Sequence, residues 1–501
     1  MIPRILLLLM LLLGFAAHAA ADPAVLRQLA AEESDDKIAA IHKLALTAEP
    51  EALALLQQLA DGSLKDDKGE EITINNRVRR ELEGALAVLK LIDPDVTVRF
   101  AAVKEIASNV DAAMAPMLAK ARDRETEPKI RALLVEAHAL ATLKDADPQL
   151  RIAAARALAG SADPNTQAQL KAQSEPANEA ETEVRRAAFQ SYLAVKDRLT
   201  LAETLGRIFS GLSLGSILLL AALGLAITYG VMGVINMAHG ELLMIGAYAT
   251  YAMQSLFRSQ FPAQEDWYLL AAVPVAFFAA AAVGVLLERT VIRWLYGRAL
   301  ETLLATWGLS LMLIQAARVI FGAQNVEVAN PSWMSGGLEI LPSIVLPLNR
   351  IVIVGFALFV LLLVWVLMNK TRLGMFVRAV TQNRAMAGCV GVPTGRIDTV
   401  AFALGAGIAG LGGVALSQIA NVGPDMGQGY IVDSFMVVVL GGVGQLAGAV
   451  WAALGLGIVT KFIESWAGAV IAKIVVLVFI IMFIQKRPQG LFALKGRFVE
   501  N

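Results

Sequence analysis

The chain has 501 residues, 57% of them hydrophobic, and its 43 Lys and Arg balance 43 Asp and Glu. The zero net charge hides two different parts, because residues 22–203 hold 24 basic and 31 acidic side chains, whereas residues 204–501 hold 18 and 12. This division excludes a single soluble domain and predicts a charged soluble domain followed by a membrane domain. The single cysteine, Cys389, excludes an intramolecular disulfide and a cysteine-based metal cluster.

Residues 1–21 have the pattern of a secretory signal peptide. Arg4 supplies the positive start, residues 5–15 the short apolar core, and the small residues around Ala19 a cleavage site. The apolar core is too short for an ordinary membrane span. An uncleaved anchor is the alternative, and both interpretations predict that the domain behind this segment is exported.

Residues 22–203 read as an exported helical-repeat domain. Apolar residues recur at three- and four-residue spacing. A hydrophobic residue followed by arginine opens several Ala/Leu-rich helices, at Val78-Arg79, Val98-Arg99, Ile130-Arg131, Leu150-Arg151 and Val184-Arg185. The steps between these pairs alternate between about 20 and about 33 residues, and stacked helix pairs of the HEAT kind fit this pattern. We expect the arginines to form structural ion pairs rather than to bind a ligand, and the domain to offer a docking surface.

Residues 204–501 read as a polytopic α-helical membrane domain. Most of its eight apolar segments reach membrane-spanning length; they are 209–230, 238–257, 268–288, 302–321, 350–368, 398–420, 431–459 and 469–485. Basic residues cluster after the third and fifth segments and at the chain's end, and the positive-inside rule places these three regions in the cytoplasm. The loops 258–267 and 322–349 carry less positive charge and suit the outer side.

The predicted number of membrane crossings conflicts with the predicted cytoplasmic position of the C-terminus. An exported N-terminal domain and eight full crossings would leave the C-terminus outside, against its basic residues. We therefore expect residues 430–463 to be re-entrant, with a break at Gly441-Gly442-Val443-Gly444-Gln445. An extra short crossing elsewhere would also restore the parity, and glycines serving only close helix packing are the alternative explanation of the break.

The stretch Thr228–Tyr248 carries the most informative polar residues. Asn236, His239 and Glu241 lie between two apolar runs without a long polar loop, so they are expected near membrane depth, where ionisable groups usually mark function. A helix turn at the interface with three capping residues is the alternative. The second break adds Gly441, Gly442 and Gln445 to the candidates for a substrate pathway, with Thr228 and Ser434 as further possibilities.

The signature Gly-Val-Ile-Asn-Met-Ala-His-Gly-Glu, residues 233–241, resembles that of the branched-chain amino acid permease family of ABC importers. Within that family the chain is most similar to the urea-type permeases, over roughly Ile208–Phe492. The resemblance implies a transport subunit in the bacterial inner membrane with its C-terminus in the cytoplasm. The implied partners are a second permease, two ABC ATPase subunits, a periplasmic substrate-binding protein and membrane lipid, with no nucleic acid among them.

The resemblance also identifies the basic loop 370–398 as the coupling loop that seats on an ATPase subunit. Its candidate residues are Arg372, Gly374, Arg378, Asn383, Arg384 and Gly388. The chain contains no P-loop, no His-Glu-x-x-His and no Gly-x-Ser-x-Gly, so we expect no enzyme activity, no cofactor, and ATP bound by a partner. The expected cargo is urea; branched-chain amino acid import, and a membrane-anchored adaptor built on the helical repeat, are the alternatives.

Overall fold

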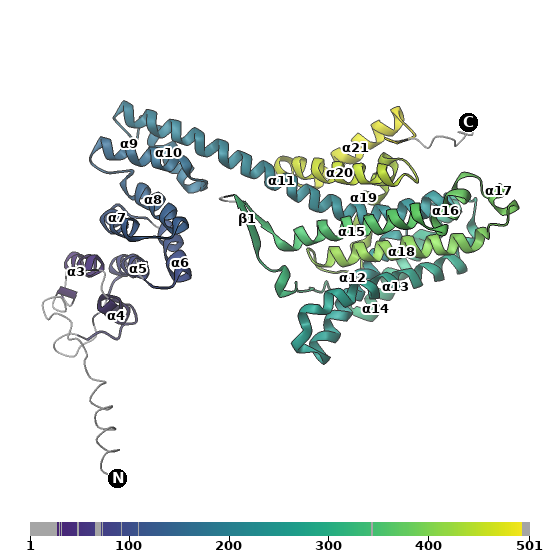
Figure 1. The fold of residues 1–501 in the computed structure, drawn as a ribbon, viewed down its shortest axis with the longest axis horizontal. Helices are drawn as coiled ribbons and strands as arrows, with labels where there is room; N and C mark the ends of the chain where they lie inside the picture. The colour runs from purple at the N-terminus through teal and green to yellow at the C-terminus, as the bar shows by residue number, and fades with distance from the viewer. Residues whose placement is uncertain are drawn as a thin grey trace, which may run out of the picture. The chain divides into compact units, whose positions relative to one another are not determined.

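The computed structural model describes residues 28–492, with short gaps at residues 30, 32, 48–49, 66–71, 73, 92, 109 and 342–343. The predicted signal peptide, residues 1–21, lies outside the described residues. The chain forms two compact units, Met1–Thr200 and Leu201–Asn501, and each is described by itself. Helix α11 (Thr182–Met232) contributes residues to both units, so the domain boundary expected after residue 203 falls within a helix (Figure 1).

The described part of the first unit is helical. Its helices are α3 (Ser34–Thr47), α4 (Pro50–Ala60), α5 (Asn76–Lys90), α6 (Val96–Ser108), η1 (Ala112–Met114), α7 (Ala115–Arg124), α8 (Pro128–Thr142), α9 (Pro148–Ala157), η2 (Leu158–Gly160), α10 (Pro164–Ser174) and the start of α11. Two groups of buried aliphatic side chains fill it, one including Leu56 and Leu134 and the other Leu158 and Leu170. The export of this unit stays a prediction.

The order of the helices explains the alternating steps between the arginines. Helix α5 is followed directly by α6, and α8 directly by α9, which gives the short steps. Between α6 and α8 lies α7, and between α9 and α11 lies α10, which gives the long steps. The repeating unit is therefore three helices long, and the stacked pairs expected for a HEAT-like domain are not confirmed.

The starts of α6, α8, α9 and α11 share a pattern that extends the hydrophobic-Arg pair, namely acid-x-acid-x-x-x-Arg. The carboxylate of the first acid accepts a hydrogen bond from the backbone N–H of the second acid, which fixes the turn before the helix. The donor and acceptor residues of these bonds are Asp95 and Asp93 (2.8 Å), Glu127 and Glu125 (2.9 Å), Asp147 and Asp145 (2.9 Å), and Glu181 and Glu179 (3.0 Å). One short sequence pattern thus starts four helices in the same way.

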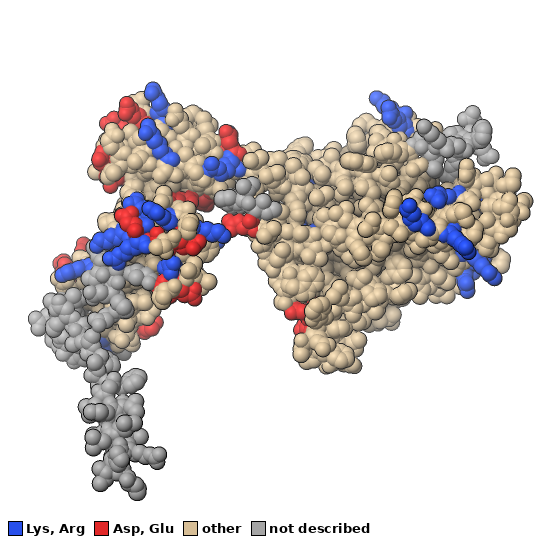
Figure 2. All heavy atoms as spheres, in the orientation of Figure 1, with Lys and Arg blue, Asp and Glu red and all other residues tan. Residues whose placement is uncertain are grey.

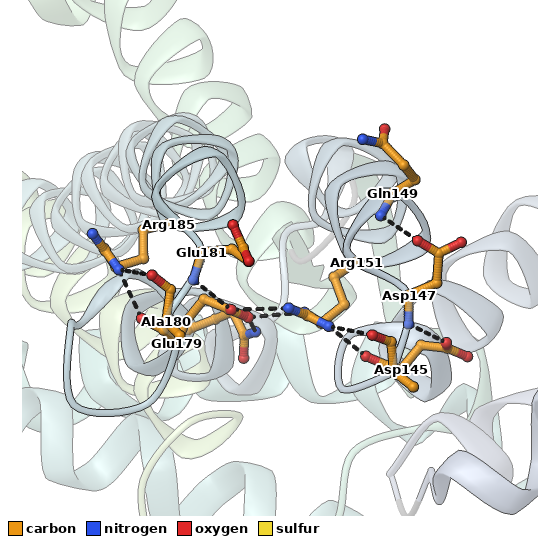
Figure 3. Close-up of polar contacts among 10 residues, drawn as sticks. Asp145, Asp147, Gln149, Arg151, Glu179, Ala180, Glu181 and Arg185 are labelled. Atoms are coloured by element: carbon orange, nitrogen blue, oxygen red, sulfur yellow. Dashed lines mark hydrogen bonds and ion pairs between the residues drawn. The ribbon is translucent and has the colours of Figure 1, made fainter.

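Arg99 and Arg151 tie one such helix start to the next. The Nε and Nη2 groups of Arg151 both donate to the carboxylate of Glu179, at 2.9 Å each, and its Nη1 donates to the carbonyl oxygens of Asp145 and Ala146 (Figure 3). Arg99 makes the same set of bonds to Glu125 and to its own preceding loop. The predicted structural ion pairs are confirmed at these two arginines.

These pairs shift the acidity of the two glutamates. Burial alone would raise the pKa of Glu179, but hydrogen bonds from Arg151 and from the backbone N–H of Glu181 hold the pKa below its ordinary value of 4.5. Glu125 behaves in the same way. Burial alone would raise its pKa, but hydrogen bonds from Arg99 and from the backbone N–H of Glu127 lower it, and the net result is a decrease.

The second unit is a helical bundle with one small hairpin. After α11 come α12 (His239–Gln260), η3 (Pro262–Trp267), α13 (Tyr268–Thr290), η4 (Ile292–Leu295), α14 (Ala299–Phe321), η5 (Ser332–Met334), β1 (Gly337–Leu341), β2 (Ile344–Pro347), α15 (Leu348–Lys370), α16 (Arg372–Gln382), α17 (Arg384–Cys389), α18 (Thr394–Ser417), α19 (Met426–Gly441), α20 (Leu446–Ala467) and α21 (Ala469–Lys486). The antiparallel pair β1–β2 departs from the expected all-α fold and lies in the predicted outer loop 322–349.

Seven described helices are long and apolar enough to cross a membrane: α11, α13 with η3, α14, α15, α18, α20 and α21. Helix α12 is not among them, although residues 238–257 were expected to span, and it carries the polar His239 and Glu241. Helix α19, with 16 residues, is shorter than the others. The break expected at 441–445 divides the segment 431–459 between α19 and α20.

Close backbone contacts at glycines hold the centre of this unit together. A Cβ atom on Gly246 of α12 would lie 2.1 Å from the carbonyl oxygen of Gly410 of α18. A Cβ atom on Gly224 of α11 would lie 2.3 Å from the carbonyl oxygen of Gly405. These contacts require glycine and bring α11, α12 and α18 together around the polar residues described next.

Charged side chains on the second unit are unevenly spread. On the face that Figure 2 shows, Lys and Arg gather near α16, α17 and the end of α21, whereas Asp and Glu appear near the connection between α12 and α13. This separation agrees with the charge pattern from which the sides of the membrane were predicted. The sides themselves stay a prediction.

Candidate functional site

The chain turns out of helical conformation between α11 and α12. Gly233 adopts a φ of +66°, and α12 starts at His239. The backbone N–H of Ala238 donates to Asn236 Oδ1 at 3.0 Å, and that of Met237 donates to Thr306 Oγ1 at 3.1 Å. A side chain of α14 therefore satisfies part of the backbone that the break exposes, as a discontinuous helix inside a membrane requires.

His239 and Glu241 lie in the first turn of α12 and face different neighbours. His239 Nε2 lies 3.0 Å from the carbonyl oxygen of Ala221 in α11. Ser310 of α14 donates to Glu241 Oε1 at 2.9 Å. A Cβ atom on Gly427, in the first turn of α19, would lie 2.8 Å from Glu241 Oε2. The carboxylate of Glu241, which belongs to α12, thus lies between α14 and α19.

Several polar atoms in this interior lack a partner. Asn236, His239 and Glu241 have exposed fractions of only 2%, 0% and 1%. Within the described residues, the buried side-chain atoms without a hydrogen-bond partner are Ser213 Oγ, Asn236 Nδ2, His239 Nδ1, Glu241 Oε2 and Tyr248 Oη. Three of these five belong to the signature 233–241. Such groups are costly to bury unless something pairs with them, so they are candidates for contact with a transported solute.

The second glycine break is confirmed where it was expected. Helix α19 ends at Gly441, Gly442 and Gly444 adopt φ values of +99° and +76°, and Gln445 precedes α20. A Cβ atom on Gly230 of α11 would lie 3.0 Å from Gly444 Cα, so this break lies beside the last turns of α11. The second break therefore packs against the turn of α11 that precedes the first break.

Gly441 and Gly442 contact the chain's own backbone. A Cβ atom on Gly441 would lie 2.5 Å from the carbonyl carbon of Gly448, so α19 and α20 cross closely there. The segment after α21 packs against the same turn, because Leu491 N–H donates to the carbonyl oxygen of Leu440 at 2.8 Å and Phe492 N–H to that of Gly441 at 3.3 Å. The last described residues thereby satisfy two carbonyl groups at the end of α19.

The basic loop forms two short helices, α16 and α17. The side chain of Thr371 caps the start of α16 by accepting a hydrogen bond from the backbone N–H of Gly374. The side chain of Asn383 caps α17 in the same way, with the N–H of Met386 as donor. Gly374 is buried, and a Cβ atom there would lie 2.0 Å from the carbonyl oxygen of Met368, so only glycine lets α16 fold back onto α15. Arg372, Arg378 and Gly388 are exposed.

Arg384 points inward from the start of α17. Its guanidinium forms a two-point ion pair with Asp398 of α18, donates to the hydroxyl of Tyr296 and lies 4.1 Å from the centre of that ring. The Tyr296 hydroxyl in turn donates to the carbonyl oxygen of Val231, at 3.5 Å, near the end of α11. Arg384 therefore connects the basic loop to the helix end beside the first break.

Comparisons with known proteins give the family. The model described as "Branched-chain amino acid transport system / permease component" matches residues 207–485, more than half of the chain. The chain belongs to this family. It is therefore a multi-pass integral membrane permease component. The match agrees with the resemblance noted over roughly 208–492 and leaves the first unit outside the family model.

Individual relatives cover the same portion. The chain is 29% identical over 294 residues to the high-affinity branched-chain amino acid transport system permease protein LivH of Escherichia coli K12, covering 57% of this chain and 94% of that protein. It is 28% identical over 293 residues to BraD of Pseudomonas aeruginosa, covering 57% and 95%. No solved structure matches the chain. These relatives do not distinguish the urea type within the family.

Proposed function

We propose that this chain is a permease subunit of an ATP-driven ABC importer in a bacterial inner membrane, and that its cargo is urea. The observation that supports this most is the group of unpartnered buried atoms in the signature, on Asn236, His239 and Glu241. The proposal assigns these atoms to the cargo pathway, together with Gly441, Gly442 and Gln445 at the second break. Alternating access would open the pathway to one side at a time.

The chemistry of the interior suits a neutral cargo with N–H donors. Urea carries four N–H donors and one carbonyl acceptor, which match carboxylate, amide and hydroxyl groups. Among the described residues, the buried polar side chains include no Lys or Arg that could bind a carboxylate. Within the pathway beside the signature, a zwitterionic amino acid would have to place its carboxylate at a helix N-terminus, such as the start of α12 or α19.

Branched-chain amino acid import is the second candidate. It is favoured by the names of the relatives, since LivH and BraD are permeases of branched-chain amino acid systems. The adaptor alternative, in which the membrane part only anchors the helical repeat, requires one or two spans. It does not account for seven candidate spans with polar residues buried among them.

The proposed complex contains a second permease, two ABC ATPase subunits and a periplasmic binding protein, all within membrane lipid. This chain would hold no cofactor, and ATP would be bound by the ATPase subunits. Helices α16 and α17 would seat on an ATPase subunit, with the exposed Met375 and Met386 as apolar contacts. The first unit would lie in the periplasm and the C-terminus in the cytoplasm.

Uptake of radiolabelled urea and leucine tests the proposal, in cells from which this chain is deleted and then restored. Loss and recovery of urea uptake alone is the expected result. Loss of leucine uptake alone would keep the permease and replace urea by an amino acid. If neither changed while the partner subunits were present, the importer would be rejected in favour of the adaptor.

The pathway is tested in the same cells with Asn236→Leu and His239→Leu, which remove the unpartnered atoms. Both variants should assemble with the partners yet import poorly. Gly308→Ala is a matched control in the same unit, because a Cβ atom there meets nothing within 4 Å. Normal uptake by both leucine variants would return the two residues to a structural role.

A further inference from the structure

A cavity of about 230 Å³ lies within the second unit, away from the signature residues. Its walls come from α11, α19, α20 and α21. Leu214, Leu218, Leu456 and Val476 make one part apolar, whereas charged side chains and Tyr430 line another. The volume is below the roughly 300–1,000 Å³ typical of pockets for drug-sized ligands. It can accept a small molecule or a lipid head group, but not two acyl chains.

Four charged groups of both signs surround this cavity. Lys473 Nζ lies 3.4 Å from Asp433 Oδ2, between α21 and α19, and Lys461 Nζ lies 2.8 Å from Glu464 Oε2 on α20. An ammonium group has three donors and a carboxylate about four acceptor positions, so neither pair exhausts its members. The cavity therefore offers both an acceptor for a cation and a donor for an anion, next to apolar walls.

The charged part of the cavity lies at the turn between α20 and α21, where Gly468 adopts a φ of +83°. Trp466 and Val470, on either side of that turn, are 77% and 75% exposed. An exposed tryptophan beside charged residues at helix ends is typical of the membrane–water interface. The apolar surface of α21 continues from there through Ile471 and Ile474, so an amphiphile in the head-group layer could enter from the side.

We infer that this cavity binds the zwitterionic head of an amphiphilic molecule. The ammonium group would lie against Asp433 and Glu464, the anionic oxygens against Lys473 and Lys461, and the apolar body along Leu214 and its neighbours. Two sources share this chemistry, a phospholipid of the phosphatidylethanolamine type and a free branched-chain amino acid. Urea lacks both charges and is not a ligand of this site. The inference does not depend on urea being the cargo.

The test uses the purified complex in detergent and measures the midpoint of thermal unfolding, with bound lipid counted by native mass spectrometry. The ligands added are phosphatidylethanolamine, phosphatidylglycerol, leucine and urea. Stabilisation by phosphatidylethanolamine and not by phosphatidylglycerol identifies a lipid site, and stabilisation by leucine alone identifies an amino acid site. No stabilisation by either zwitterion, or equal effects of both lipids, overturns the inference.

The variants Asp433→Asn and Lys473→Gln should each weaken binding of the zwitterion about tenfold, because each removes one charge-assisted contact. Glu301→Gln is the matched control, since it removes the acid of the exposed Arg298–Glu301 pair outside the cavity. An equal loss in Glu301→Gln would show that the effect is not specific to the cavity and would overturn the inference. Lys473 is 58% exposed, so its variant serves if Asp433→Asn does not assemble.

Discussion

Arg151 shows how much one side chain can connect in the helical repeat. Its guanidinium donates to the carboxylate of Glu179 and to two carbonyl oxygens before its own helix (Figure 3). The side chains of Arg151 and Glu179 are only 13% and 5% exposed. Removing the arginine would leave a buried carboxylate without its cation, which destabilises more than the loss of an exposed pair.

We therefore predict that Arg151→Met lowers the free energy of local unfolding around residues 145–181 by about 2 kcal/mol. Amide hydrogen exchange of the full chain should become about thirtyfold faster in these residues. Arg131→Met is the control, because Arg131 holds the equivalent position in α8, is exposed, and has no ion pair among the described residues. Equal exchange in the two variants would contradict the prediction.

The lowered pKa values of Glu125 and Glu179 predict an acid limit for the same repeat. A carboxyl whose pKa is lower in the folded than in the unfolded state binds protons more weakly when folded. It therefore stabilises the fold above its ordinary pKa of 4.5, and this contribution is lost as the pH falls through the folded value. Stability of the first unit should begin to fall below pH 4.5.

Pepsin cleavage of the full chain at a series of acidic pH values measures this loss. The expected result is cleavage within residues 93–185 that rises as the pH falls. The double variant Glu125→Gln, Glu179→Gln, compared with the natural chain at each pH, should be cleaved more readily near pH 5 but change less on further acidification. The same increase with acid in both proteins would show that other carboxyl groups set the limit.

At the scale of elements, the turn between α19 and α20 is the most constrained part of the second unit. Gly442 combines a φ of +99° with a position where a Cβ atom would lie 2.4 Å from the carbonyl oxygen of Phe492. A side chain there is strained by its backbone conformation and also displaces the segment that covers the end of α19.

Gly442→Ala should therefore release residues 490–492 from α19 and lower both the thermal stability and the transport activity of the complex. The measurement is the unfolding midpoint of the purified complex together with uptake in cells. Gly455→Ala is the control within α20, because a Cβ atom there meets nothing within 4 Å. An unchanged unfolding midpoint and unchanged uptake in Gly442→Ala would mean that the contact of residues 490–492 with α19 contributes to neither property.

Sequence alone predicted the elements better than their contacts. Hydrophobic periodicity, the glycine break and basic clusters are local signals, so most helices and the turn at 441–445 were found. The division of the segment 431–459 at this turn was expected as well, whereas its re-entrant path stays a prediction, because an apolar run shows its length but not its direction. The acid-x-acid-x-x-x-Arg pattern was present in the sequence, but its acids were noticed upstream of only two helices, at Asp93-Pro94-Asp95 and Asp147-Pro148.

The contacts that were missed join residues far apart in the chain. Nothing in the local sequence around Arg384 shows that Asp398 and Tyr296 receive its guanidinium, or that the tail at Leu491 reaches α19. His239 and Glu241, two residues apart on one helix, were not expected to share a face, and the structure directs them toward α11 and α14. Which helices they contact was not predicted. Such pairings depend on how helices pack, which periodicity does not specify.

At the scale of the whole molecule, the proposed coupling needs a mechanical connection from α16 and α17 to the transport pathway. The structure contains one. Arg384 binds Asp398 at the start of α18 and Tyr296 at the end of η4, and Tyr296 reaches the carbonyl of Val231 one residue before the end of α11. Beside it, Glu288 of α13 accepts from Arg293 and from Thr399 of α18. The ends of α11, α13 and η4 and the starts of α17 and α18 therefore lie on two neighbouring sets of polar contacts.

If ATPase movement reaches the pathway through this connection, Arg384→Gln and Asp398→Asn should separate hydrolysis from transport. We expect the assembled complex to keep its basal ATPase activity but to lose most cargo-stimulated activity and uptake, since each variant removes one half of the same ion pair. Because the two residues act together, the double variant should be no worse than either single one. Arg396→Gln, an exposed arginine between them in sequence, should behave like the natural chain. Normal stimulation in both single variants would remove this connection from the mechanism and leave α16 and α17 as an attachment site only.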